Sequence, residues 1–267
     1  MMIDHAQKDK SPNHVETVTW VHHWTKRLFS FRITRPPSFR FRSGEFVMIG
    51  LGDAHRPIMR AYSIASPSFA DELEFLSIKV PGGAFTSRLQ RVAPGDNVLL
   101  GKKSTGTLVL DALKGGERLF MIGTGTGLAP FLSVPRDPET YARFGRVVVT
   151  HTVRKTEELA YRRLFEEEIF EDEVVGAEAR SKLTYYPTVT RAPFFRQGRI
   201  TDRIETGDFF SDLGITSQSF DRTRDRVMLC GSMAMNKDMA AILDRFGLSE
   251  GSNHEPGEYV LERAFVG

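Results

Sequence analysis

Alternating apolar and polar residues characterise the first part of the chain. Phe29, Phe31 and Ile33 alternate with Ser30 and Arg32, and this period of two predicts a half-buried β-strand. Further short strands are expected at residues 46–51, 59–65, 73–80 and 98–100, with a short helix at 84–91. Proline and glycine separate these segments, so the pattern predicts a small antiparallel barrel.

Short continuous apolar runs replace this alternation in the second part of the chain. Strands are expected at residues 119–122, 146–150, 183–190 and 227–230, and helices at 157–170 and 234–246. Strands that alternate with helices predict a parallel sheet covered on both faces. The expected fold is therefore two-domain, with an antiparallel β-barrel at residues 1–112 and a parallel, five-stranded α/β domain at residues 113–267.

The composition fits a globular protein and excludes several classes. Of 267 residues, 40% are hydrophobic and 26% are charged, so a disordered chain is not expected. The single cysteine, Cys230, excludes a disulfide framework, a zinc ribbon and a cluster held by four thiolates of this chain. No apolar run approaches the roughly 20 residues of a membrane span, and residues 1–14 show no apolar signal-peptide core. We therefore expect a cytoplasmic protein without membrane contact.

Charge is unevenly distributed, although the formal net charge is only +2. A nucleic-acid-binding protein would usually be more basic, so nucleic acid is not an expected partner. The stretch from residue 20 to residue 60 holds two acids and eight basic residues, namely Lys26, Arg27, Arg32, Arg35, Arg40, Arg42, Arg56 and Arg60. This stretch is either a solvated face or a docking surface for an acidic partner. The acidic residues at 166–173 are interpreted as a solvated face.

A glycine-rich segment follows the first strand of the second domain. Gly123, Thr124, Gly125, Thr126 and Gly127 come after an apolar run and before an expected helix. Glycines there let a phosphate approach the backbone, and a helix start offers free N–H groups. The alternative is a strand–helix turn without a ligand. No lysine completes a nucleoside-triphosphatase loop, so that class is not expected.

Arginine stands where an acidic residue would mark NAD as the cofactor. Arg154 follows the second strand of this domain, and Thr190, Arg191 and Arg199 follow the third. Asp or Glu at the first position would bond a free ribose 2′-hydroxyl, whereas guanidinium groups suit a 2′-phosphate. The pattern therefore favours NADP(H) over NAD(H), the alternative being unrelated surface arginines.

Four residues on an expected barrel strand combine groups that suit a flavin. In Arg60-Ala61-Tyr62-Ser63, a tyrosine can stack on a planar ring, an arginine can neutralise a pyrophosphate and a serine can bond a ring atom. Alternation directs Arg60 and Tyr62 to one face of the strand and Ala61 and Ser63 to the other. The alternative is a core tyrosine beside a surface arginine.

Together these motifs resemble those of the ferredoxin–NADP reductase family, in the family's order and over nearly the whole chain. Arg60–Ser63 resembles its R-x-Y-S flavin motif, Gly83–Thr86 its second flavin element, Gly123–Pro130 its pyrophosphate loop, and Cys230–Ser232 its C-G-x element beside the nicotinamide. The resemblance implies that the barrel binds FAD and that the α/β domain binds NADP(H).

The resemblance also implies a set of site residues. The FAD-binding set is Arg60, Ala61, Tyr62, Ser63, Ile78, Lys79, Val80, Gly83, Ala84, Phe85, Thr86 and Phe265. The NADP-binding set is Gly123, Thr124, Gly125, Thr126, Gly127, Arg154, Thr190, Arg191, Arg199, Gly231, Ser232 and Met233. The catalytic set is Ser63, Cys230 and Ala264.

The C-terminus departs from the plant-type members, which end in a tyrosine that stacks on the flavin. This chain ends Arg263-Ala264-Phe265-Val266-Gly267, which is similar to the bacterial members with a C-terminal extension. That similarity implies Ala264 against the isoalloxazine and Phe265 against the adenine of FAD, the alternative being a frayed tail. Cys230 is either a small buried residue or one that shapes the nicotinamide site without covalent chemistry.

The implied function is an FAD-dependent oxidoreductase that passes electrons between NADPH and a one-electron carrier, ferredoxin or flavodoxin. The carrier would dock on a basic face, and a monomer without a metal site is expected. Two alternatives share the cofactor motifs. One is a free-flavin or ferric reductase of the same superfamily, and the other is a non-catalytic flavin or nucleotide sensor.

Overall fold

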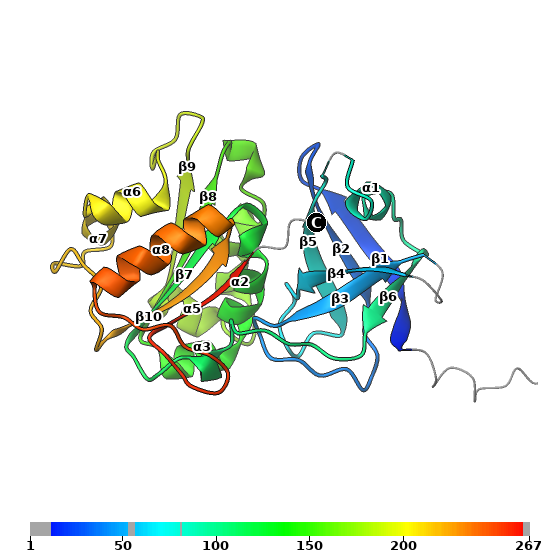
Figure 1. Ribbon diagram of the computed structural model, residues 1–267, viewed down its shortest axis with the longest axis horizontal. Coiled ribbons are helices and arrows are strands. Elements are labelled where there is room, and N and C mark those ends of the chain that lie inside the picture. Colours follow the sequence, from blue (N-terminus) through cyan, green and yellow to red (C-terminus); the bar gives the residue numbers. More distant parts are fainter. Residues whose placement is uncertain (1–11, 53–56, 81, 264–267) are drawn as a thin grey trace, which may run out of the picture.

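Two β-sheet domains lie side by side in the computed structural model, which describes residues 12–52, 57–80 and 82–263 (Figure 1). The first contains a six-stranded antiparallel sheet and the second a five-stranded parallel sheet with helices on both faces. This arrangement confirms the predicted fold class. No helix among the described residues has the length and apolar character needed to cross a bilayer.

The first domain is a barrel whose sheet has the strand order β4-β3-β6-β1-β2-β5. Its elements are β1 (Asn13–His23), β2 (Leu28–Thr34), β3 (Phe46–Leu51), β4 (Ile58–Ser63), β5 (Glu72–Ile78), α1 (Thr86–Leu89) and β6 (Asn97–Gly101). The two end strands, β4 and β5, meet on the far side. There the hydroxyls of Tyr62 and Ser77 lie 3.0 Å apart, and Ala65 N–H donates to the Glu74 carbonyl at 2.8 Å. The sheet therefore curls into a barrel.

Alternation on β2 explains the barrel core, and packing of the second domain explains why two residues of the other face are also buried. Phe29, Phe31 and Ile33 are fully buried inside the barrel, as the period of two predicts. Ser30 and Leu28 are also buried, although they point to the opposite face. Leu28 belongs to the apolar cluster of the second domain, because that domain packs against this face of the barrel.

The second domain has a parallel sheet with the order β11-β10-β7-β8-β9. Its strands are β7 (Arg118–Thr124), β8 (Arg146–Val153), β9 (Leu183–Val189), β10 (Asp225–Gly231) and β11 (Tyr259–Arg263). Its α-helices are α2 (Pro130–Ser133), α3 (Pro138–Arg143), α4 (Arg162–Glu166), α5 (Gly176–Lys182), α6 (Ile200–Glu205), α7 (Asp208–Asp212) and α8 (Met233–Arg245). A 3₁₀ turn at Leu110–Ala112 links the two domains, and further 3₁₀ turns of the second domain occupy Gly125–Leu128, Val134–Arg136, Thr156–Glu158 and Glu168–Glu171.

Each face of the parallel sheet has its own apolar cluster. One face packs against α6, α7 and α8, which lie together in Figure 1. The other packs against α2, α3, α4 and α5, and this cluster also contains Leu28, Ala65 and Leu76 of the barrel. The interface between the domains is thus continuous with a hydrophobic core.

Three sequence-based expectations need correction. The continuous helix predicted at 157–170 is broken, because Tyr161 has a left-handed φ of 59° and Glu167 leaves helical geometry with φ −137°. The helix predicted at 84–91 shrinks to α1, Thr86–Leu89. Strands β1 and β11 were not predicted, because neither segment shows a clear apolar alternation.

Candidate functional site

The predicted nucleotide-binding residues gather at the carboxyl edge of the parallel sheet. Strands β7, β8, β9 and β10 all end there, because parallel pairing places their carboxyl ends side by side. The glycine-rich segment, Arg154, Thr190–Arg191 and Gly231–Met233 therefore share one edge. The ends of β7 and β10 also meet directly, since Ser232 N–H donates to Thr124 Oγ1 at 3.4 Å.

The glycine-rich segment leaves β7 as a 3₁₀ turn that leads into α2. Gly125 has φ +55°, and apart from its two chain neighbours no described residue lies within 4 Å of the position where a Cβ would stand. A Cβ on Gly127 would lie 2.0 Å from the Cys230 carbonyl oxygen, so this glycine lets the loop pack against β10. The loop is held close to the sheet on one side and open on the other, which fits a pyrophosphate group.

A buried histidine on β8 contacts the backbone of the glycine-rich segment. His151, on β8, lies 3.2 Å from the Gly125 carbonyl through Nε2 and 3.2 Å from the Tyr185 hydroxyl through Nδ1. Burial lowers the pKa of His151 to about 4, so the imidazole is neutral near pH 7. A carbonyl can only accept, so Nε2–H donates to Gly125 and Nδ1 accepts from Tyr185. Sequence reasoning missed His151, because the sequence does not reveal its buried partners.

The predicted 2′-phosphate arginines lie on segments whose backbones meet at the same edge. Arg191 N–H donates to the Arg154 carbonyl at 2.8 Å, and the Glu158 carboxylate accepts from Arg154 N–H at 3.0 Å. Arg199 is the N-cap residue of α6, after a segment that bends back onto β9 through a Gly198 N–H bond to the Val189 carbonyl. All three guanidinium groups are exposed, and none forms an ion pair with any residue that the structure describes.

Two aromatic residues stand between these arginines. Phe194 and Phe195 have ring centroids 4.3 Å apart, and the Arg196 guanidinium lies 4.9 Å from the Phe195 ring. Phe195 is 66% exposed, which is unusual for a phenylalanine. Sequence reasoning did not single them out, although paired aromatics between arginines were a usable signal.

The predicted flavin motif lies on β4. The Tyr62 ring contacts Phe31, Phe75 and Phe85 at centroid distances of 6.0–6.3 Å, and burial raises its pKa to about 12. The phenol is therefore neutral and joins β4 to β5 through Ser77. Arg60 is exposed, and its guanidinium bonds only the neighbouring Met59 carbonyl among described residues.

The second predicted flavin element, Gly83–Thr86, follows β5 and is hydrogen-bonded to the residues just after that strand. Val80 N–H donates to Thr86 Oγ1 at 3.2 Å, so the buried Thr86 hydroxyl ties α1 to the segment after β5. A Cβ on Gly83 would lie 2.7 Å from the same hydroxyl. The hydroxyl is thus already engaged by the protein. Ile78, Lys79 and Val80 are half-buried beside it, and Ala84 is exposed.

A chain of contacts joins the two groups of predicted site residues. Cys230 on β10 pairs with Glu262 on β11, and the carboxyl of Glu262 accepts from Thr107 N–H, just after the barrel. Gly106 lies next to both that carboxyl and the ring of Phe46, because a Cβ on this glycine would contact both groups. Phe46 on β3 is in turn the antiparallel strand partner of Ser63 on β4. The edge of the parallel sheet therefore meets the flavin motif of the barrel here.

Cys230 and Glu262, two titratable residues at this meeting point, are both buried. Burial and the nearby Glu262 raise the pKa of the Cys230 thiol well above its usual range, so it is no nucleophile at neutral pH. Burial also raises the pKa of Glu262 to about 7. Its Oε2 atom has no hydrogen-bond partner among the described residues. Sequence reasoning missed Glu262. Ala264 and Phe265, two other predicted site residues, lie outside the described residues.

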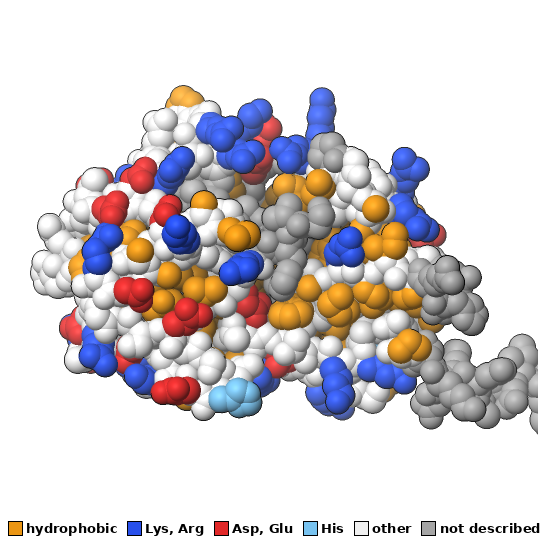
Figure 2. Space-filling view, in the orientation of Figure 1, with side chains coloured by type: hydrophobic (Ala, Val, Ile, Leu, Met, Phe, Trp, Pro, Cys, Tyr) orange, Lys and Arg blue, Asp and Glu red, His pale blue; other side chains and the backbone are white. Residues whose placement is uncertain are grey.

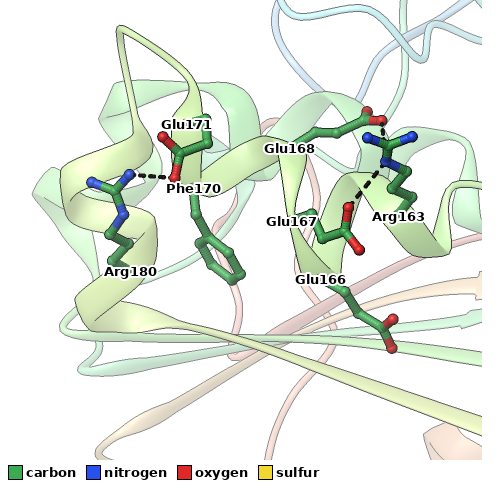
Figure 3. Close-up of a pocket in the computed structure, with 7 residues that line it drawn as sticks. All are labelled: Arg163, Glu166, Glu167, Glu168, Phe170, Glu171 and Arg180. Atoms are coloured by element: carbon green, nitrogen blue, oxygen red, sulfur yellow. Dashed lines mark hydrogen bonds and ion pairs between the residues drawn. The ribbon is translucent and has the colours of Figure 1, made fainter.

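A surface hollow elsewhere does not coincide with these residues. Figure 3 shows it along α4, the 3₁₀ turn after it and α5, where four glutamates and two arginines line the surface. Arg163 pairs with Glu167 and Glu168, and Arg180 pairs with Glu171. The four glutamates of the hollow are exposed and arginines neutralise only part of their charge, so this part of the acidic block is a solvated face.

Comparisons with known proteins agree with this geometry. Residues 14–108 match the oxidoreductase FAD-binding domain family, and residues 121–241 match the oxidoreductase NAD-binding domain family. Ferredoxin–NADP reductase A of Sorangium cellulosum is 53% identical over 252 residues, which cover 94% of this chain and 90% of that protein. A flavodoxin/ferredoxin–NADP reductase of Rhodobacter capsulatus is 53% identical over 253 residues, covering 94% and 93%.

A solved structure gives the same result in three dimensions. A ferredoxin NADP⁺ reductase from Neisseria gonorrhoeae, with bound FAD and NADP, superposes with a TM-score of 0.86 at 30% identity, covering 96% of this chain and 100% of that one. A flavin-binding barrel joined to a nucleotide-binding sheet defines a two-domain, FAD-dependent oxidoreductase. Within that class, the chain belongs to the family of bacterial ferredoxin–NADP reductases.

Proposed function

We propose that the protein transfers electrons between NADPH and a small one-electron carrier, ferredoxin or flavodoxin. When bound, FAD and NADP(H) supply the redox chemistry, in which a hydride is exchanged between nicotinamide C4 and flavin N5. The observation that carries the proposal is the contact chain from Cys230 through Glu262 to Phe46 and Ser63, which brings the nucleotide edge to the flavin motif. Reaction between two bound rings requires that proximity.

Residues at the carboxyl edge of the parallel sheet bind different parts of NADPH. The open side of Gly125 offers backbone N–H groups to the pyrophosphate, and His151 holds that loop in place. Arg154, Arg191 and Arg199 supply guanidinium donors for the 2′-phosphate. Phe195 supplies an exposed aromatic surface for the adenine ring. Gly231 and Ser232 keep the start of α8 close to β7. Met233, the first residue of α8, is exposed there.

The barrel residues orient the flavin. Tyr62 offers one side of its ring for stacking, Ser63 a hydroxyl near the reacting edge, and Arg60 a charge for the pyrophosphate. Cys230 is small, neutral and buried, so it shapes the nicotinamide pocket and excludes water without forming a covalent bond. Ala264 against the flavin ring remains a proposal, as does Phe265 against the adenine.

The domain division at residues 112 and 113 is part of this proposal. It is supported by the segment after residue 112, which binds to the second domain. Leu113 forms a bridge with Gly257, and Lys114 N–H donates to the Gly257 carbonyl at 2.9 Å.

The carrier would dock on basic residues of the barrel, but the basic stretch from residue 20 to residue 60 is not uniform. Arg42 pairs with Glu45 and Asp111, Arg32 pairs with Glu74, and Arg35 donates to three backbone carbonyls. Lys26, Arg27 and Arg40 are exposed and form no ion pair with the described residues. Figure 2 shows Lys and Arg side chains along the upper rim of both domains. The exposed cations Lys26, Arg27 and Arg40 suit an acidic carrier.

NADPH-driven reduction of ferredoxin and of flavodoxin at several salt concentrations tests the proposal. Carrier reduction should slow as salt rises, because the Debye length falls from about 30 Å at 0.01 M to about 8 Å at 0.15 M. Reduction of a small neutral acceptor should not change. Faster reduction of free flavin or ferric complexes than of either carrier would contradict the proposal.

A further inference from the structure

A buried polar network crosses the interface between the two domains. Tyr161, in the α/β domain, places its hydroxyl 2.6 Å from Ser30 Oγ and 2.6 Å from Glu74 Oε1, both in the barrel. Trp24 Nε1–H donates to the same Ser30 hydroxyl at 2.9 Å, and Arg32 pairs with Glu74 at 3.2 Å. The Trp24 and Tyr161 rings are also in contact, with centroids 4.7 Å apart. The motifs of both cofactor sites leave this network without a role.

The chemistry of the groups fixes the direction of each hydrogen bond. An ionised carboxylate can only accept, so the Tyr161 hydroxyl donates to Glu74. Ser30 then donates to the Tyr161 oxygen, and Trp24, which can only donate, completes the chain at Ser30. Each side chain of the network therefore has a hydrogen-bond partner. The network ends on the Glu74 carboxylate, whose second oxygen, Oε2, accepts from Arg32. Such a connected network favours one relative placement of its members.

The backbone of Tyr161 is arranged to reach the barrel. Its φ of 59° is unusual for a residue other than glycine, and it interrupts the helix that the sequence predicts. Three residues earlier, Glu158 accepts N–H bonds from Arg154 at 3.0 Å and Lys155 at 3.1 Å. One short segment therefore connects the proposed 2′-phosphate arginine to the barrel.

We propose that Tyr161 is a positioning residue for hydride transfer, whose hydroxyl fixes the α/β domain in the orientation that brings the two cofactor rings together. The inference rests on the proposed function for its reaction step. The reason is geometric, because a reaction between bound rings is sensitive to small displacements, and a misplacement of about 1 Å can cost roughly 100-fold in rate. The apolar part of the interface favours association of the domains, and the buried hydrogen bonds of Tyr161 favour one orientation, together with the bond from Ser43 Oγ to Asp137 at 2.7 Å.

The variant Tyr161→Phe keeps the ring and removes only the hydroxyl. Flavin reduction by NADPH, followed in single-turnover experiments, should slow by about 10-fold or more. FAD content and the Kd for NADP⁺, measured by calorimetry, should stay within about 3-fold, since the binding residues are untouched. The kinetic isotope effect with 4-deuterated NADPH should rise. A wild-type rate of flavin reduction in this variant would overturn the proposal.

The matched control is Tyr141→Phe. Tyr141 is also buried, but its hydroxyl donates to the Pro135 carbonyl at 2.8 Å within the α/β domain. This variant should keep the rate of flavin reduction within about 2-fold of wild type, even where its melting temperature falls. An equal loss of rate in Tyr141→Phe would show that general destabilisation causes the effect, and would overturn the proposal.

A readout independent of turnover completes the test. Thermal unfolding of Tyr161→Phe, Glu74→Gln and the double variant should be non-additive, because the two side chains share one hydrogen bond. Amide exchange in residues 24–30 and 159–165 should accelerate in Tyr161→Phe. Additive shifts with unchanged exchange would overturn the proposal. If wild-type protein is reduced by NADPH but reduces neither carrier, the carrier assignment fails while the role of Tyr161 stands.

Discussion

The backbone N–H of Arg191 donates a 2.8 Å hydrogen bond to the carbonyl oxygen of Arg154. This bond joins the loops after β8 and β9, so two arginines separated by 36 residues become neighbours. Both side chains are exposed to solvent at this edge of the sheet. No described carboxylate pairs with either side chain. The pair is therefore suited to bind a phosphate from solution.

The first prediction concerns cofactor preference. The wild-type protein should prefer NADPH over NADH by at least about 100-fold in kcat/KM. Arg191→Ala should lower kcat/KM for NADPH by roughly 10-fold to 100-fold, since it removes a charge-assisted hydrogen bond worth about 1.5–3 kcal/mol. Steady-state kinetics with both nucleotides measures this. Use of NADH should be spared, and Arg163→Ala on α4 serves as the control. Equal efficiency of wild type with NADH would contradict the assignment.

The second prediction concerns His151. His151→Leu leaves the Gly125 carbonyl and the Tyr185 hydroxyl without this partner, and each unmet group costs about 1–3 kcal/mol. Calorimetry should show weaker NADP⁺ binding, while FAD content stays unchanged. His151→Gln should partly restore binding, because its amide can donate to Gly125. Burial lowers the pKa of His151 to about 4, so wild-type binding should show no inflection from this group near pH 6.5. Unaltered binding in His151→Leu would refute the supporting role.

The third prediction separates two roles of Tyr62. Tyr62→Ala should weaken FAD retention, because a ring stack contributes about 0.5–1.5 kcal/mol beyond area burial. Tyr62→Phe keeps the ring and loses only the bond to Ser77, so it should retain FAD. Arg60→Ala should weaken retention through loss of charge. Flavin absorbance of the purified variants measures occupancy. Full occupancy with unchanged spectra in Tyr62→Ala and Arg60→Ala would refute the flavin motif.

The fourth prediction concerns pH and Glu262. Burial raises the pKa of Glu262 to about 7 in the folded protein, well above that of an exposed carboxyl. Between the pKa of an exposed carboxyl and about 7, the folded protein keeps Glu262 protonated, whereas the unfolded protein does not. The contribution of Glu262 to the free energy of unfolding therefore falls as pH rises toward 7. Glu262→Gln should remove this dependence, worth on the order of 3 kcal/mol across the window. Denaturant unfolding at several pH values measures it, and parallel wild-type and variant profiles would show an unperturbed carboxyl.

The fifth prediction compares two neighbouring arginines of the barrel. Arg40→Glu should slow carrier reduction at low salt, because charges at a docking surface act mainly on the association rate. Arg42→Glu should have a smaller electrostatic effect on docking, because Arg42 is already paired with Glu45 at 3.0 Å and Asp111 at 3.5 Å. Hydride transfer should be unchanged in Arg40→Glu, as stopped-flow flavin reduction would show. The decisive measurement is made where carrier association limits the rate. If carrier reduction then depends neither on Arg40 nor on salt, the basic stretch is only a solvated face.

The sequence by itself determined the features that depend on neighbouring residues in the chain. Alternation at Phe29, Phe31 and Ile33 indicated a barrel strand, and the glycines at 123–127 marked the turn after β7. The order of strands and helices also predicted the parallel sheet. It followed that Arg154 and Arg191 would meet, because parallel strands end at one edge. Local periodicity and chain topology are sufficient for these predictions.

Only the tertiary structure decided the features that depend on distant residues. The helix expected at 157–170 is broken because Tyr161 turns toward Glu74 and Ser30, and no local pattern records those partners. The pKa values of His151 and Glu262 depend on burial by other elements. Burial and ion pairing arise from groups that folding brings together, so they are absent from any short stretch of sequence.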